Sequence, residues 1–519
     1  MSDSKLELER PYSWTDSMGN TYRYYKNPLF KACSFILIQE TCERLAFYGI
    51  NPTIKSFTRD NYGFTENDAG TFVAMFSGLI YIFSLVSAIL ADTVLGTYNT
   101  ILIFSAVYMG GLALLVVSAI TFIDQLWMVY IALWVLLAVG AGGIKSCVSV
   151  LGGQQYCPDQ PKEHITTFFT LFYASINVGA LIGGIAVPIT AKEADSYAVA
   201  YMLPAIAFAA ATVVLVLGSK RYVKMKPQGS TVLEIFKVIG SGASHMSIDK
   251  CRKSQGGKYD DHFIDDAKSL FTLLPLFGLV IPFNVCYTQI FTGFETQSLK
   301  MNTSLFGWDM PHELMVNVDP ISVILGSLFV DKFLFPYLRS KNMMPTILYR
   351  FVIGFICGLI SNICAMGLEF VVMDSADKTV SIWWQIPQFA FIAFGEIFII
   401  STSYEVAFSK SPEALKTVAS AFNLVGFAIA GFIAAALIKS CKGWTDYGHC
   451  DYYYAVLAAM SGFFAFVSFF SNSYFEKVFA RAEAHQHASM LRMQKENDGA
   501  LDETGFTNMD ISEIPERTA

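Results

Sequence analysis

Charged side chains are scarce in this sequence. Asp, Glu, Lys and Arg make up 15% of the 519 residues, whereas 54% are hydrophobic. Soluble domains contain about 25% charged residues, and a soluble protein this apolar would lack the polar side chains needed to cover its surface. The composition therefore excludes an ordinary soluble domain and favours a protein embedded in lipid. The sequence also lacks a basic stretch interleaved with aromatic residues, so no nucleic-acid partner is predicted.

Metal-binding and catalytic patterns are missing as well. The ten cysteines form no C-x-x-C pair and no His/Cys spacing that would hold a metal, and no nucleophile–base constellation stands out. The sequence therefore predicts neither an enzyme nor a cofactor. Cys441 and Cys450 flank one short loop, where a disulfide is allowed but not required. The first thirty residues lack a signal-peptide pattern, so the first membrane span is expected to act as the insertion signal.

Long apolar runs are what the sequence has in abundance. Stretches of about 20 residues, the length that crosses a bilayer as a helix, recur along the whole chain. They predict an all-α integral membrane protein with about twelve spans. The expected spans lie near residues 31–57, 69–91, 99–122, 126–151, 165–190, 199–219, 267–294, 317–338, 346–373, 382–409, 415–438 and 452–475.

One long polar interruption separates two sets of about six spans each. Its Lys and Arg residues are expected to hold it in the cytoplasm together with both termini. Two six-helix halves around a central cavity resemble the major facilitator superfamily, in which substrates bind between the halves near the middle of the membrane. The expected parts are a cytoplasmic N-terminal segment, an N-terminal bundle, a cytoplasmic linker, a C-terminal bundle and a polar cytoplasmic tail, over residues 1–30, 31–219, 220–266, 267–475 and 476–519.

The first span carries three charged residues, Glu40, Glu43 and Arg44. At about 1.5 Å of rise per residue they lie roughly 14–20 Å deep, where each charge costs about 2.5–3.5 kcal/mol on insertion. The group is therefore expected to serve a function. The alternative is a local ion pair between Glu40 and Arg44, one helical turn apart, but that pair leaves Glu43 unexplained.

Polar residues also lie in later spans at related depths. Lys145 in the fourth span either faces the interior or reaches the inner membrane surface with its long side chain. Tyr173 and Asn177 are four residues apart and share one face of the fifth span, and the tenth span carries Glu396 and Glu405. Cations in the first half and carboxylates in the second predict a cavity that suits a zwitterion.

Four stretches resemble the signatures of the proton-dependent oligopeptide transporter family. They are residues 40–49 (ETCERLAFYG), 142–155 (GGIKSCVSVLGGQQ), 172–179 (FYASINVG) and 395–412 (GEIFIISTSYEVAFSKSP). The resemblance runs in register across nearly all spans. It implies that Arg44 and Lys145 bind the carboxylate of a peptide.

The same resemblance assigns the remaining contacts. Glu405 would bind the amino terminus of the peptide, and Tyr173 and Asn177 would bond to its backbone. Glu40 and Glu43 would compete for the guanidinium of the first span and, with Glu405, couple transport to protons. A carboxylate beside a guanidinium stays ionised until its partner is drawn away, and then it takes up a proton.

Several positions depart from the family pattern. Ala74 stands where animal relatives have His, and Asn423 stands where an aromatic residue is usual. In the seventh span, Asn284 is an expected pocket residue and Thr288 replaces the acid of bacterial relatives. Asp319 replaces a common Asn and is expected to face the cavity; its alternative role is a helix N-cap before a proline.

These residues lead to one functional hypothesis. The protein is expected to be a proton-coupled symporter of dipeptides and tripeptides in the plasma membrane, with peptides, protons and the lipid bilayer as its partners and with its oligomeric state left open. A family relative that carries nitrate or another anion is the first alternative, although Glu405 and Asp319 would repel an anion. A non-transporting peptide sensor is the second, although the tail is too short and polar for an added folded domain.

Overall fold

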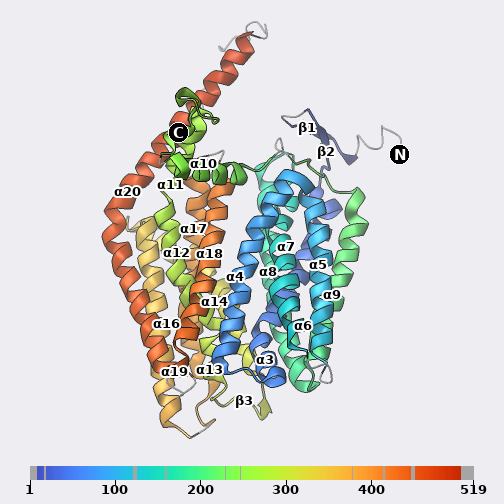
Figure 1. Cartoon of the computed structure of the whole chain (residues 1–519), viewed down its shortest axis with the longest axis vertical. Helices are drawn as coiled ribbons and strands as arrows, with labels where there is room; N and C mark the ends of the chain where they lie inside the picture. The colour runs from blue at the N-terminus through green and yellow to red at the C-terminus, as the bar shows by residue number, and fades with distance from the viewer. Residues whose placement is uncertain are drawn as a thin grey trace.

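The computed structural model describes residues 9–503, apart from 17–18, 121–124, 158–159, 228, 246, 377, 413–414 and 446–449. Helices dominate the described part and run roughly side by side (Figure 1). Among the described residues, eleven helices are long and apolar enough to cross a membrane. The prediction of an all-α membrane protein is therefore confirmed.

The helices of the N-terminal half lie between residues 34 and 217. They are α2 (Ser34–Ile50), α3 (Ile54–Tyr62), α4 (Glu66–Leu90), α5 (Thr97–Ser118), α6 (Leu126–Tyr130), α7 (Ala138–Gly153), α8 (Lys162–Glu193) and α9 (Tyr197–Leu217).

One helix of the linker and the helices of the C-terminal half follow. They are α10 (Thr231–His245), α11 (Asp261–Phe271), α12 (Leu274–Tyr287), α13 (Gly293–Ser298), α14 (Val318–Phe329), α15 (Phe335–Ser340), α16 (Ile347–Asp374), α17 (Ile386–Ser409), α18 (Lys416–Ser440), α19 (Lys442–Thr445) and α20 (Cys450–Glu503). The seventh span is broken, because a short 3-10 turn, η8 (Thr288–Phe291), separates α12 from α13.

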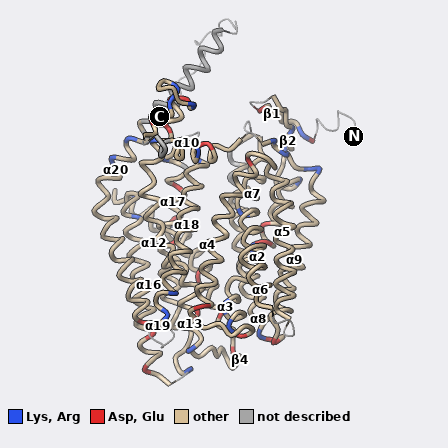
Figure 2. The backbone as a smooth tube through the Cα atoms, viewed as in Figure 1, with Lys and Arg blue, Asp and Glu red and all other residues tan. Residues whose placement is uncertain are grey.

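The first predicted span differs from the other eleven. It consists of α2 and α3 with short irregular turns beside them, and its buried charges make it too polar to count as a span by composition. Within the N-terminal half, α2 nevertheless packs along α8 and α9. Figure 2 shows the charged residues gathering toward the two ends of the molecule, which makes the charges within the bundle exceptional.

A close approach of α2 and α8 sets the position of the first span. A Cβ at Gly179 would lie 2.8 Å from the Cβ of Arg44 and would collide with the backbone oxygen of Thr41. Only a residue without a side chain allows this contact, because neither atom belongs to the flexible end of a side chain.

Gly179→Ala is therefore expected to destabilise the protein by about 2 kcal/mol, since overpacking a tight contact costs about 1–3 kcal/mol. The melting temperature of the purified protein in detergent measures this effect. Gly367→Ala is the matched control, because a Cβ there meets nothing within 4 Å and alanine favours a helix. A melting temperature of Gly179→Ala equal to that of the parent would contradict the prediction.

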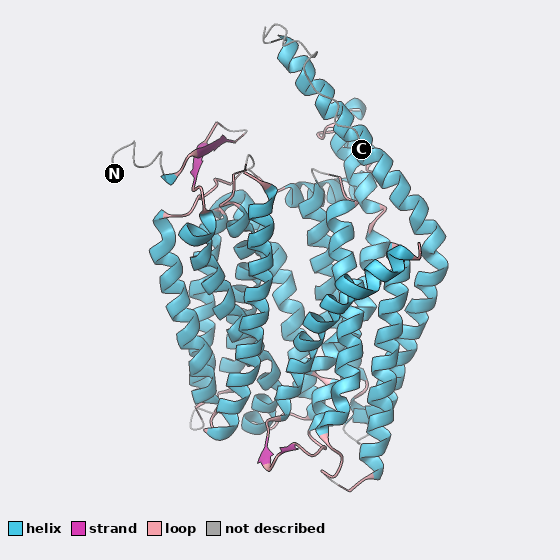
Figure 3. Cartoon of the chain, turned by 180° about the vertical axis from the view of Figure 1, so that it is seen from behind, coloured by secondary structure: helices cyan, strands magenta, loops and turns pink. Residues whose placement is uncertain are grey.

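The two ends of the bundle carry different small elements (Figure 3). At one end lie α10, the C-terminal part of α20 and an antiparallel hairpin of β1 (Tyr12–Thr15) and β2 (Thr21–Tyr24), in which Tyr12 pairs with Tyr24. We call this the linker end. The hairpin of β3 (Ser304–Leu305) and β4 (Trp308–Asp309) marks the other end, which we call the β3–β4 end.

Some boundaries differ from the sequence-based expectations. The last helix does not stop near residue 475 but continues to Glu503, and the rest of the expected tail lies outside the described residues. The hairpin within the expected polar N-terminal segment was not predicted. No disulfide joins Cys441 to Cys450, since the buried Cys450 thiol is free.

Candidate functional site

A cavity of about 310 Å³ lies between the two halves. Side chains from α2, α4, α7 and α8 form one wall, and side chains from α12, α14, α17 and α18 form the other. A volume of this size falls within the range of small-ligand sites in proteins, about 300–1,000 Å³.

Two cations belong to the N-terminal wall. Lys145 on α7 donates from Nζ to the hydroxyl of Tyr81 at 3.3 Å and lies 4.3 Å from the centre of that ring. Among the described residues it has no carboxylate within ion-pair distance. Lys145 therefore faces the cavity rather than the membrane surface, and its charge is available to a ligand.

Arg44 is the second cation, and it already has two acidic partners. Its Nε lies 3.1 Å from a carboxylate oxygen of Glu40, and its Nη2 forms an ion pair with Glu43. All three side chains are buried. The local Glu40–Arg44 pair considered as an alternative exists, but Arg44 binds Glu43 as well, so one guanidinium serves two carboxylates.

Tyr173 and Asn177 line the same wall from α8. They lie one turn apart, and Nδ2 of Asn177 donates to the backbone oxygen of Tyr173 at 2.8 Å. About half of the surface of Tyr173 is exposed. Both side chains can therefore offer polar groups to a ligand in the cavity.

The opposite wall contains Asn284, Thr288 and Asp319. The side chains of Asn284 and Thr288 each donate one hydrogen bond to a backbone oxygen of α12, at 2.9 and 2.8 Å. Asp319 lies in the first turn of α14, but the cap position belongs to Asn317 and no side chain caps this helix. The N-cap interpretation of Asp319 is therefore wrong, and its carboxylate lines the cavity.

Glu405 does not lie where the sequence analysis expected it. It is absent from the cavity lining, half-exposed, and its carboxylate accepts a hydrogen bond from Nη1 of Arg350 at 2.6 Å. The acid of α17 that lines the cavity is Glu396, followed by Ile400 and Tyr404.

Helical geometry explains this correction. Nine residues separate Glu396 from Glu405, and at about 100° per residue they point to opposite faces of one helix. The spacing 396, 400, 404 instead follows a single face. That periodicity was present in the sequence and could have identified Glu396 as the inward-facing acid.

The cavity is closed at the β3–β4 end by contacts between the halves. Lys55 on α3 is fully buried and donates to the backbone oxygen of Thr292 at 3.1 Å and to Oγ1 of Thr296 at 2.5 Å. It also pairs with Glu66 at 2.8 Å and with Glu295 at 3.9 Å. These contacts join α3 and α4 of the first half to α13 of the second.

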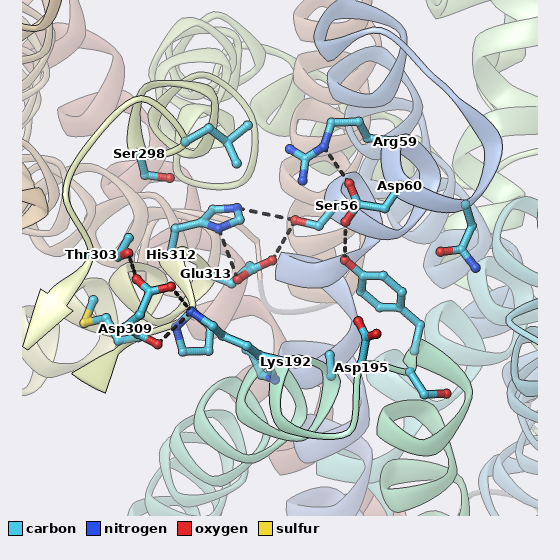
Figure 4. A pocket seen from close by; sticks show the side chains of 18 of the residues that line it. Ser56, Arg59, Asp60, Lys192, Asp195, Ser298, Thr303, Asp309, His312 and Glu313 are labelled. Carbon is cyan, nitrogen blue, oxygen red and sulfur yellow. Dashed lines mark hydrogen bonds and ion pairs between the residues drawn. The ribbon is translucent and has the colours of Figure 1, made fainter. Parts of the chain in front are cut away.

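A second layer of contacts surrounds a polar pocket of about 580 Å³ at the same end (Figure 4). Ser56 donates to Glu313 at 2.6 Å, and Glu313 also lies 3.5 Å from a ring nitrogen of His312. Nearby, Lys192 binds Asp309 at 2.5 Å and so ties α8 to β4. The central cavity is therefore sealed from this end by several ion pairs and hydrogen bonds.

Comparisons with known proteins agree with this architecture. A sequence model of the POT family matches residues 98–447. The Arabidopsis thaliana protein NRT1/PTR FAMILY 8.1 is 28% identical, over 86% of this chain and 95% of its own length, and the probable peptide transporter ptr2 of Schizosaccharomyces pombe is 26% identical, over 84% and 77%. The crystal structure of the POT family transporter PepTSo matches with a TM-score of 0.74 at 24% identity, over 88% of this chain and 98% of its own. The chain is therefore a multi-pass membrane transporter, not an enzyme, and belongs to the POT family.

Proposed function

We propose that this protein carries dipeptides and tripeptides across the membrane together with protons. The observation that carries the proposal is the separation of charge in the cavity: the lining residues of one wall include Arg44 and Lys145, whereas those of the other include Asp319 and Glu396. A peptide without charged side chains has one carboxylate and one ammonium at its two ends. Such a molecule matches the two walls when it lies across the cavity.

Each lining residue then has a definite role. Lys145, with Arg44, binds the peptide carboxylate, and Glu396 rather than Glu405 binds the amino terminus. Tyr173 and Asn177 on one wall and Asn284 on the other provide hydrogen bonds to the peptide backbone. No cofactor is required for these contacts.

Proton coupling rests on the cluster around Arg44. A guanidinium that turns toward the substrate carboxylate weakens its pairing with Glu40 and Glu43. A buried carboxylate that loses its cation is destabilised in its charged form and therefore takes up a proton. Each proton that enters down a potential of about 100 mV supplies about 2.3 kcal/mol, which can drive the uptake of a neutral peptide.

Closure at the β3–β4 end supports an alternating-access mechanism. The Lys and Arg residues of the linker favour the cytoplasm for the linker end and for both chain termini, so we place the closed end outside and the protein in the plasma membrane. Opening this end requires breaking the contacts of Lys55 and Lys192 while the opposite end closes. The cavity is then exposed to one side of the membrane at a time.

The anion alternative fits the site less well. Asp319 and Glu396 place two carboxylates in the cavity wall, which opposes the binding of nitrate or another small anion. A non-transporting peptide sensor would bind the same peptides without accumulating them, so uptake measurements distinguish it from a transporter.

Uptake of labelled dialanine into proteoliposomes tests the proposal. With an imposed proton gradient, acidic outside, we expect accumulation well above the equilibrium level, and collapse of the gradient by a protonophore should abolish it. Empty liposomes and labelled nitrate are the controls. Accumulation of nitrate without dialanine, or dialanine uptake that ignores the gradient, would contradict the proposed function or its coupling.

A further inference from the structure

We propose that Asp319 and Glu396 select peptides whose first residue carries a positive side chain, such as lysyl and arginyl peptides. This inference rests on the proposed function and specifies the substrate class of the same cavity. It starts from the observation that this wall holds one carboxylate more than a zwitterionic peptide can satisfy.

The two carboxylates lie in the same cavity wall as one phenol hydroxyl. Tyr287 on α12 donates to Oδ2 of Asp319 at 3.3 Å, and Tyr287, Asp319 and Glu396 all line the cavity. Asp319 comes from the start of α14 and Glu396 from the middle of α17. Three helices therefore bring two acids and one phenol together at a single place in the cavity wall.

Neither acid is fully satisfied by the described part of the protein. Oδ1 of Asp319 and Oε2 of Glu396 are buried atoms that accept no hydrogen bond there. The whole Asp319 residue is only 6% exposed, yet it lines the cavity. A buried carboxylate oxygen without a donor is costly, so these two oxygens are positioned to receive donors from a ligand.

The described residues that line this wall include no cation. Asn284 and Thr288 from α12 and η8 are neutral, as are Tyr404 and Phe427 from α17 and α18. The two cations of the cavity belong to the opposite wall, where Arg44 already serves Glu40 and Glu43. Within the described part of the chain, the cavity and the adjoining Arg44 cluster thus contain four carboxylates and two cations.

A peptide with a basic first residue matches this arrangement. Its carboxylate pairs with Lys145, and its α-ammonium pairs with Glu396. The ammonium or guanidinium of its first side chain pairs with Asp319. Both unsatisfied oxygens then accept charge-assisted hydrogen bonds, which are stronger than bonds to neutral donors. A peptide with a neutral first residue leaves Oδ1 of Asp319 without a donor.

A pair of matched ligands isolates the side-chain charge. Lysylalanine and norleucylalanine have side chains of nearly equal length, but only the first carries an ammonium group. Their affinities are measured by isothermal titration calorimetry with the purified full-length protein, which requires no transport. We expect lysylalanine to bind about tenfold more tightly than norleucylalanine.

The variant Asp319→Asn keeps the shape of the side chain and removes its charge. We expect it to reduce the preference for lysylalanine over norleucylalanine to less than about twofold. Asp374→Asn, at the exposed C-terminal end of α16, makes the same chemical change outside the cavity. It should leave the preference intact.

The outcomes separate this inference from the proposed function. Equal binding of lysylalanine and norleucylalanine by the parent, with dialanine still bound, would overturn the inference alone and would leave the acidic pair as a proton carrier. A preference that survives in Asp319→Asn would also overturn it. Absence of binding for all three peptides would overturn the inference together with the proposed function.

Discussion

Replacing Glu396 by glutamine is expected to lower dialanine uptake about a hundredfold, which corresponds to roughly 3 kcal/mol lost from a charge-assisted hydrogen bond. Glu396 lines the central cavity, and one of its oxygens is buried without a donor. In the proposed function it binds the ammonium group of the peptide. Glutamine keeps the size of the side chain and removes the charge that attracts the ammonium.

Glu405→Gln provides the control on the same helix. Glu405 is half-exposed and pairs with Arg350 away from the cavity, and pairs at exposed positions contribute about 0–1 kcal/mol. Uptake by Glu405→Gln is expected to stay within about fivefold of the parent. Initial rates in proteoliposomes, normalised to the amount of inserted protein, measure both variants. The opposite ranking of the two variants would restore Glu405 to the substrate site.

The sequence was sufficient for the parts of the molecule that local patterns determine. Apolar runs identified the spans, because a helix in lipid needs an uninterrupted stretch of about 20 apolar residues. Charges within such runs identified Arg44 and Lys145, since a buried charge needs a specific partner or a function, whereas Asp319 was identified by its departure from the family pattern. Each of these residues lines the cavity between the halves.

Features that depend on tertiary contacts could not be read in the same way. Lys55 lies near the end of the first span and reads as an ordinary interfacial lysine, yet the fold buries it against Glu66 and Glu295. The choice between Glu396 and Glu405 required knowing which face of α17 meets the cavity. Family motifs placed both acids in one stretch but did not distinguish their faces, whereas helical periodicity did.

The second large effect is expected at the closed end. Lys55→Met retains the bulk of the side chain but removes its charge, which leaves Glu295 buried among the remaining contacts. Breaking a buried ion pair by removing one partner costs about 3–5 kcal/mol. The contacts of Lys55 join the two halves when this end is closed. The substitution therefore destabilises the closed state relative to the open state. The ratio of closed to open molecules should fall by about two to nearly four orders of magnitude, at about 1.4 kcal/mol for each factor of ten.

Lys192→Met is the matched control for an exposed pair at the same end. Lys192 also joins the halves, but its partner Asp309 is largely exposed. The hydrogen bonds from Lys192 and from the Thr303 hydroxyl hold the pKa of Asp309 below its usual value. The stabilisation is therefore fully present at neutral pH and is lost only as the pH falls through that lowered pKa. An exposed pair of this kind contributes about 0–1 kcal/mol, so Lys192→Met should change the ratio by no more than about fivefold.

Hydrogen–deuterium exchange in lipid nanodiscs can compare the two variants. In Lys55→Met, the amides of α3 and α13 should exchange much faster than in the parent, because the open state exposes both segments to solvent. In Lys192→Met they should exchange at nearly the parental rate. Exchange in α16, which lies within one half, reports on global unfolding and should stay unchanged in both variants. If α3 and α13 of Lys55→Met exchanged like the parent, the buried Lys55 contacts would not be what keeps this end of the transporter closed.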